Sequence, residues 1–204
     1  METNRYLQIV AKIVSILLHP LLMPFYVLIL VFNIQSIFSL IPSVTKWYCF
    51  LVTGITLFLI PLLCMPILKH FRLIRDFSLE DEMDRIWVLL VMGASTFFGF
   101  WLLSDISYTD VIQRLYLILI ILETSSLSIT SKWKISLHMV GIGGVCGLLF
   151  ILGYKYFGHT EVWLMIWLLL AGLLASSRLY LGKHTPAQVY VGFILGNLFA
   201  TLLF

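Results

Sequence analysis

The stretch SSRLYLGKHTPAQVYVG, residues 176–192, places an arginine, a lysine, a histidine and a glutamine between two strongly apolar segments. Of the 204 residues, 61% are hydrophobic and 11% are charged, and the mean hydropathy is +1.03. An ordinary soluble domain has about 25% charged residues. The composition therefore predicts a membrane protein, in which polar groups at the edge of an apolar segment are costly and indicate function.

The apolar segments on both sides of this stretch are long enough to cross a hydrocarbon core of about 30 Å, which takes about 20 helical residues. The first segment, 7–40, is too long for one straight span, and we expect an interfacial helix that turns into a span near Pro20. The fold class is an all-α, polytopic membrane helical bundle of six or seven spans, and residues 1–204 form one domain. The later spans are expected at 47–68, 86–103, 111–129, 136–154, 162–175 and 186–204.

The connections between these spans alternate between two membrane faces. One face receives ten of the 13 Lys and Arg residues and the other receives Lys46, Arg114 and Lys155. Such an excess is typical of the cytoplasmic side. The rich face also carries three polar stretches, which are EDEMDR (80–85), KWKISLHM (132–139) and SRLYLGKH (177–184). We expect their cations, a hydroxyl and two histidines to converge as a binding site.

The last of these stretches follows a recognisable pattern. Ser177 and Arg178 are followed after five residues by His184 and after three more by Gln188 and Val189. This order resembles SRxxxxxHxxxDV, the third motif of the type 2 phosphatidic acid phosphatase (PAP2) superfamily, with glutamine in place of aspartate.

Two weaker matches precede it in the order that the family requires. The sequence ISLH at 135–138 keeps Ser136 and His138 of the second motif, PSGH, but lacks its proline and glycine. Arg85 is the counterpart of the arginine in the first motif, KxxxxxxRP, whose lysine and proline are missing here. The resemblance covers about residues 85–192.

The resemblance implies a PAP2-like core and hydrolysis of a lipid phosphomonoester or diphosphate through a phosphohistidine, without a metal or other cofactor. His184 is then the nucleophile and His138 the acid that protonates the leaving oxygen, roles that suit an imidazole near neutral pH. Fixed cations suit a transition state whose charge spreads over phosphate oxygens. The implied phosphate-binding residues are Arg178, Arg85, Ser136 and Lys132.

The substrates implied are phosphatidic acid, phosphatidylglycerophosphate or a polyprenyl diphosphate, in a bacterial inner membrane. Family members commonly act on the outer face, whereas the charge count favours the cytoplasmic face, so both orientations stay open. The net charge of +3 is explained by the membrane surface, and nothing indicates nucleic acid. The three cysteines have no metal-ligand spacing.

Gln188 departs from the family pattern at the residue that orients the nucleophile. Its amide oxygen can accept a hydrogen bond from the histidine but adds no negative charge, so we expect a weaker nucleophile. Thr185 and Gln188 also fit a capping box, and Pro186 suits the first helical position. A helix starting here points free N–H groups at an anion.

Glu123 is an ionisable residue inside an expected span, and such a position indicates a functional role. We expect it to support Lys132, Arg178 or a site histidine. Other polar and small residues have simpler interpretations. His19 beside Pro20 is a helix-break residue, the acidic residues at 80–84 form a solvated ion-pair network, and the glycine pairs 143/147 and 192/196 allow close helix packing.

Two alternatives to the phosphatase use the same residues. In the first, the altered motifs belong to a lipid-phosphate binder or membrane scaffold of the same fold that does not hydrolyse. In the second, the chain resembles CAAX-type intramembrane metalloproteases, with Glu80 as the base and His138 or His184 as metal ligands. Lys134 occupies the place of the phenylalanine in their FxxxH motif, which argues against this alternative.

Overall fold

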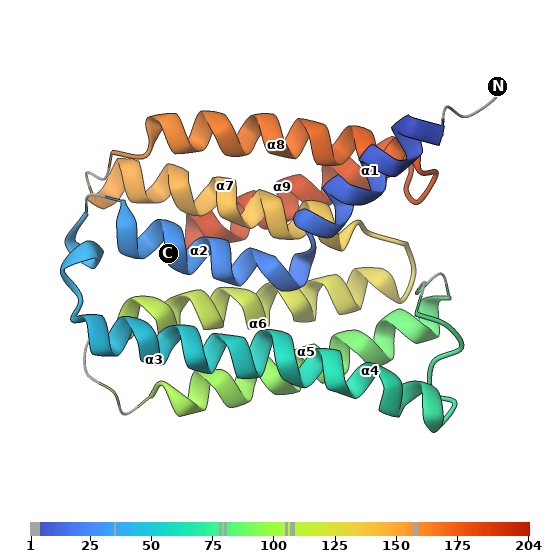
Figure 1. Ribbon diagram of the computed structural model, residues 1–204, viewed down its shortest axis with the longest axis horizontal. Coiled ribbons are helices and arrows are strands. Elements are labelled where there is room, and N and C mark those ends of the chain that lie inside the picture. The colour runs from blue at the N-terminus through green and yellow to red at the C-terminus, as the bar shows by residue number, and fades with distance from the viewer. Residues whose placement is uncertain are drawn as a thin grey trace. The chain divides into compact units, whose positions relative to one another are not determined.

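A computed structural model (Figure 1) describes residues 5–34, 36–77, 79, 81–104, 106, 109–156 and 159–204. The chain is 83% helical, and no strand occurs in these ranges. Seven helical stretches in them are long and apolar enough to cross a membrane. The predicted all-helical, multi-pass membrane fold is thereby confirmed.

The chain divides into two compact units. The first comprises Met1–Ile37 and Ile135–Phe204, and the second comprises Phe38–Lys134. The prediction of one domain over residues 1–204 concerns both units together and stays a prediction. The stretches that resemble the second and third motifs both belong to the first unit, and Arg85 of the first motif belongs to the second unit.

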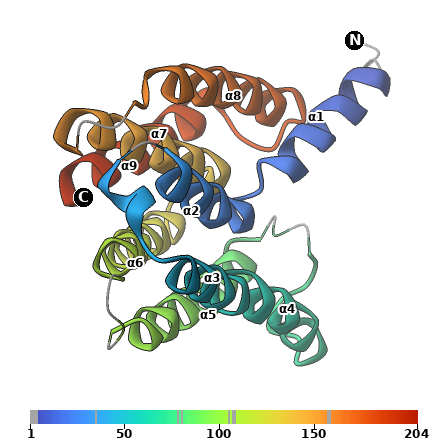
Figure 2. The same cartoon turned by 60° about the vertical axis from the view of Figure 1, so that its left-hand side comes forward.

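The N-terminal segment of the first unit is broken where the sequence predicts a turn. Helix α1, Arg5–Leu17, is followed by the short 3-10 helix η1, Pro20–Leu22, and by α2, Met23–Asn33. His19 has φ −69° and ψ 141°, because a following proline disfavours the helical conformation. Helix α1 packs against α8, Glu161–Tyr180, as Figures 1 and 2 show.

Helices α7, Leu137–Tyr156, and α9, Pro186–Leu203, form the closest helix pair of this unit. A Cβ atom added at Gly192 would lie 2.8 Å from the Ser136 carbonyl oxygen, and one at Gly196 would collide with the Val140 carbonyl. Residue numbers rise together along the contact, so the two helices are parallel. The predicted packing role of these glycines is confirmed.

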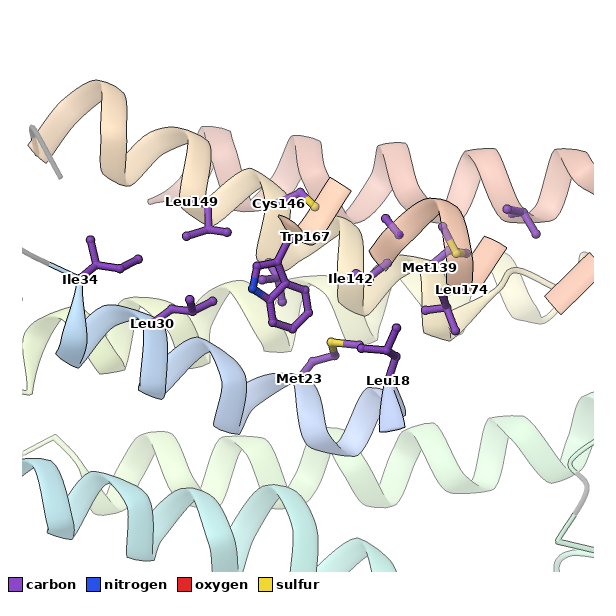
Figure 3. Close-up of a cluster of buried hydrophobic side chains, with 13 residues drawn as sticks. Leu18, Met23, Leu30, Ile34, Met139, Ile142, Cys146, Leu149, Trp167 and Leu174 are labelled. Atoms are coloured by element: carbon purple, nitrogen blue, oxygen red, sulfur yellow. The ribbon is translucent and has the colours of Figure 1, made fainter. Parts of the chain in front are cut away.

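A cluster of buried apolar side chains fills the space between α2, α7, α8 and α9 (Figure 3). Met23 and Leu30 of α2 lie across from Ile142 and Leu149 of α7. Trp167 of α8 completes the cluster and contacts Tyr26, with ring centroids 5.3 Å apart. This core fixes α2 to the unit that carries the second and third motifs.

The second unit contains the remaining helices. These are the 3-10 helix η2 (Ile37–Leu40, which begins in the first unit), α3 (Ser43–Thr53), the π-helix η3 (Gly54–Leu59), α4 (Ile60–His70), α5 (Glu82–Leu102) and α6 (Asp110–Thr130). Polar groups link them inside the unit, because the Tyr116 hydroxyl lies 3.2 Å from Thr53 Oγ1 and 3.0 Å from Thr56 Oγ1. The Ser95 hydroxyl donates to the Thr56 carbonyl.

One predicted helix end is wrong. The span expected to stop at residue 175 continues to Tyr180, so Arg178 lies on α8 and not in a connection. The hydroxyls of Ser176 and Ser177 donate to the carbonyls of Gly172 and Leu173, at 2.9 and 2.8 Å. Since the helix itself satisfies these hydroxyls, the polar residues do not end it.

Candidate functional site

The turn after α8 sets the spacing between Arg178 and His184. Gly182 N–H donates to the Leu179 carbonyl at 3.0 Å, and Lys183 N–H to the Arg178 carbonyl at 3.2 Å. These are the two hydrogen bonds of a Schellman motif. Gly182 has φ +64°, which glycine adopts without steric cost. The chain therefore reverses within a few residues and returns His184 to the end of α8.

The start of α9 fixes the imidazole of His184. The predicted capping box is present, with Thr185 as N-cap and Gln188 at the third helical position. Thr185 N–H donates to Gln188 Oε1 at 3.0 Å, and His184 Nδ1 lies 3.2 Å from the same atom. A backbone N–H can only donate, so this atom is the amide oxygen. His184 Nδ1 must then carry the proton, which leaves the lone pair on Nε2.

His138 lies in the first turn of α7, and Ser136 directly precedes this helix. The Ser136 carbonyl accepts from Met139 and Val140 N–H, both at 3.0 Å. The Nε2 atom of His138 lies 3.2 Å from the Ser15 carbonyl of α1. The His138 and His19 rings make an edge-to-face contact, with centroids 5.2 Å apart and planes at 83°.

The parallel packing of α7 and α9 brings these groups to one end of the first unit. Both helices begin there, and α8, which connects them, ends there with Arg178 in its last turn. Arg178, His19 and His184 lie close enough to His138 for electrostatic interaction with its ring. His138, His184 and Arg178 therefore belong to the same end of the first unit, and their assignment to one phosphate site stays a prediction.

Three buried polar atoms at this end have no hydrogen-bond partner among the described residues. They are Arg178 Nε, Ser136 Oγ and Ser15 Oγ. Ser136 is fully buried. A buried donor without a partner costs about 1–3 kcal/mol, and a phosphate oxygen would satisfy a guanidinium and a hydroxyl together. The arrangement suits an anion.

The other predicted site residues belong to the second unit. Arg85 is buried in the first turn of α5, where its Nε donates to the Asp81 carbonyl at 3.4 Å, and its Nη1 has no partner in the described part of the chain. Lys132 follows α6 and is exposed. The predicted assignment of both residues to the phosphate site stays a prediction.

Glu123 has a partner that the sequence did not indicate. Thr96 of α5 donates to Glu123 Oε1 at 2.9 Å, whereas Glu123 Oε2 is buried without a hydrogen-bond partner among the described residues. The predicted support of Lys132, Arg178 or a histidine stays a prediction. Within the second unit, the described contact of Glu123 joins α5 to α6.

The acidic stretch at the start of α5 contains the expected ion pair and a buried carboxylate. Arg75 pairs with Asp81 at 2.7 Å. The two Asp84 oxygens lie 3.1 Å from Arg75 N–H, and one of them lies 3.3 Å from Asp76 N–H. Glu80, the base of the metalloprotease alternative, lies outside the described residues. These contacts show Asp84 holding the loop onto α5.

His19 and the Ser15 carbonyl are the neighbours of the site that the sequence did not identify. His19 is predicted as a helix-break residue, and it does cap η1 by accepting Leu21 N–H at Nδ1, 3.3 Å away. Its contact with His138 bridges 119 positions of sequence, counted from residue 19 to residue 138. A backbone carbonyl has no signature in the sequence, so no pattern could indicate Ser15.

A comparison with protein-family models matches residues 86–204 to the model described as the PAP2 superfamily. This match covers more than half of the 204 residues and includes Ser136, His138, Arg178 and His184. No curated protein and no solved structure matches the chain. The N-terminal segment with Ser15 and His19 lies outside the matched region.

Proposed function

Because the chain belongs to the PAP2 superfamily, whose members are generally phosphatases, we propose that it is a membrane lipid phosphatase that works through a phosphohistidine. Its substrate is a lipid phosphomonoester or diphosphate, such as phosphatidic acid, phosphatidylglycerophosphate or a polyprenyl diphosphate. The proposed setting is a bacterial inner membrane. The proposed reaction uses no metal.

One observation carries the proposal. Buried, unpartnered donors of Arg178 and Ser136 occur at the same end of the first unit as two imidazoles. Burying an unpaired guanidinium nitrogen in an apolar bundle costs free energy, which an interaction with a ligand must compensate. A phosphate group supplies that compensation, and Arg178 can bind it through two parallel hydrogen bonds.

The proposed reaction begins with attack of His184 Nε2 on phosphorus. Nδ1 keeps its proton and donates it to the Gln188 oxygen, so the lone pair is on the attacking nitrogen, Nε2. As the bond from phosphorus to the lipid oxygen breaks, His138 gives that oxygen a proton. Arg178 and Ser136 stabilise the charge on the remaining phosphate oxygens. Water then attacks phosphorus and releases His184. The now neutral His138 takes the proton that this water loses.

The experiment that tests the proposal offers the purified protein three lipids in detergent. Phosphatidic acid, phosphatidylglycerophosphate and a polyprenyl diphosphate are each incubated with the protein in the presence of EDTA, and released phosphate is measured. We expect release from at least one lipid at a rate that EDTA does not change. Tight binding of a lipid without release would contradict hydrolysis and favour the non-catalytic binder.

Replacing Gln188 with glutamate should increase the rate of phosphate release. The side chain keeps its length, so one carboxylate oxygen can still accept from Thr185 N–H and His184 Nδ1. The added negative charge stabilises the positive charge that develops on His184 during attack. Exchange of an acid for an amide in a related triad costs about 10⁴-fold, and we expect a gain of about tenfold or more.

A methionine at position 188 is the matched control. It has a similar length but no comparable acceptor, so Thr185 N–H and His184 Nδ1 both lose the oxygen that they bond. We expect release to fall about 100-fold, with a loss of about 1 kcal/mol from the missing hydrogen bond to Thr185 N–H. Equal rates for Gln188→Glu, Gln188→Met and the wild type would show that residue 188 only caps the helix.

A further inference from the structure

The segment around the break between α1 and η1 contributes two contacts to His138. Ser15 supplies a carbonyl oxygen 3.2 Å from His138 Nε2, and His19 places its ring against the His138 ring at 5.2 Å. Both residues precede the region that matches the family, residues 86–204. The core cluster shown in Figure 3 holds the flanking Leu18 and Met23 against α7 and α8.

The hydrogen bonds determine which nitrogen of each ring carries a proton. The Ser15 carbonyl can only accept, so His138 Nε2 carries a proton and donates it. The other nitrogen, Nδ1, is the one available for proton transfer. In His19, Nδ1 accepts from Leu21 N–H at 3.3 Å, so a neutral His19 ring carries its proton on Nε2. The position of each ring is therefore fixed from the backbone.

We infer that His19 is a positioning residue for His138 in the proposed hydrolysis, and that with the Ser15 carbonyl it aims His138 Nδ1 at the leaving lipid oxygen. The inference rests on the proposed function. His19 touches His138 and acts through it. The N-terminal segment thereby becomes part of the site, although it lies outside the family match.

The proton balance follows from these contacts. In the acid form, His138 carries a proton on both nitrogens, a charge that a bound phosphate dianion favours. The Nε2 proton stays on Nε2, which donates it to the Ser15 carbonyl. The Nδ1 proton moves to the lipid oxygen as the bond from that oxygen to phosphorus breaks. His138 is then neutral. Edge-to-face packing against His19 restricts rotation of the His138 ring, which keeps Nδ1 directed.

Two substitutions separate the ring contact from the capping role of His19. His19→Asn retains a side-chain acceptor for Leu21 N–H, as asparagine is a good N-cap, but removes the ring. His19→Phe retains a ring against His138 but removes the acceptor. His159→Asn is the matched control, because His159 is exposed at the other end of α8.

Comparing two substrates distinguishes a defect in proton donation by His138 from a general loss of hydrolytic activity. An alkyl phosphate of a lipid needs a proton on its leaving oxygen, whereas 4-nitrophenyl phosphate leaves as a stable phenolate. We expect His19→Asn to slow release from the lipid by about 10–100-fold, as misplacement of a catalytic group does. Its rate with 4-nitrophenyl phosphate should change less than about threefold. His19→Phe and His159→Asn should retain lipid turnover within about threefold of the wild type.

The opposite patterns overturn the inference. If His19→Phe is slow and His19→Asn is normal, His19 serves only as a cap. If His19→Asn slows both esters equally, its effect does not pass through the acid, and if His19→Phe is as slow as His19→Asn, the ring contact is not the cause. A wild-type protein that hydrolyses neither ester shows that the proposed function itself is wrong, and the inference falls with it.

Discussion

Replacing His184 with alanine should reduce phosphate release from a lipid substrate by about 10⁴-fold or more, as removal of a nucleophile does in other covalent enzymes. The hydrogen bond to the Gln188 oxygen keeps the proton of a neutral His184 on Nδ1, so Nε2 is the nitrogen that can attack phosphorus. Water would have to attack the lipid phosphate directly in the variant. Released phosphate in detergent, compared at equal protein concentration, measures the change.

A matched control distinguishes lost chemistry from lost folding. His159→Ala removes an exposed histidine from the other end of the first unit, and we expect it to keep the wild-type rate. His184→Ala should retain the thermal unfolding temperature of the wild type within a few degrees, because the ring is only half-buried. A well-folded His184→Ala protein that still releases phosphate at a rate near the wild type would contradict the phosphohistidine.

Replacing Gly196 with alanine should both destabilise the protein and slow phosphate release. The new Cβ would collide with the Val140 carbonyl and approach Gly144 N at 2.8 Å. Neither atom belongs to a flexible side chain, so α7 and α9 must separate. Overpacking of this kind costs about 1–3 kcal/mol or more. Because this packing places His138 relative to His184, both unfolding temperature in detergent and turnover should fall.

Gly172→Ala is the matched control for this substitution. Gly172 lies in α8, and an added Cβ meets no atom within 4 Å. Alanine inside a helix is favoured over glycine by about 0.5–1 kcal/mol, so stability should be unchanged or increased, and turnover unchanged. Equal behaviour of Gly172→Ala and Gly196→Ala would show that close packing of α7 and α9 does not hold the site together.

Local patterns in the sequence were enough to predict the parts of the fold that depend on neighbouring residues. Apolar segments about 20 residues long identify spans because the bilayer has a fixed thickness. The break at Pro20 and the cap formed by Thr185 and Gln188 follow from the chemistry of adjacent residues. The spacing of Gly192 and Gly196 indicates their packing face. Each of these features is confirmed.

Features that depend on the hydrogen-bond geometry of a helix or on distant partners could not be predicted. The end of α8 extends past Ser176 and Ser177 because their hydroxyls bond within the helix. The π-helix at Gly54–Leu59 has no local sign. The contact between Ser15 and His138 joins a carbonyl, which every residue has, to a side chain 123 positions away. The hydrogen bond from Thr96 to Glu123 likewise joins residues 27 positions apart.

The hydrogen-bonded turn between α8 and α9 has a consequence for how the protein responds to its lipid surroundings. Helices tilt when the thickness of the bilayer changes, and a flexible linker would let two helices tilt independently. The bond from Lys183 N–H to the Arg178 carbonyl couples the end of one helix to the start of the next. The Arg178 guanidinium and the His184 imidazole, which lie on either side of this turn, then move together. We therefore expect the reaction rate to depend little on acyl-chain length of the host membrane.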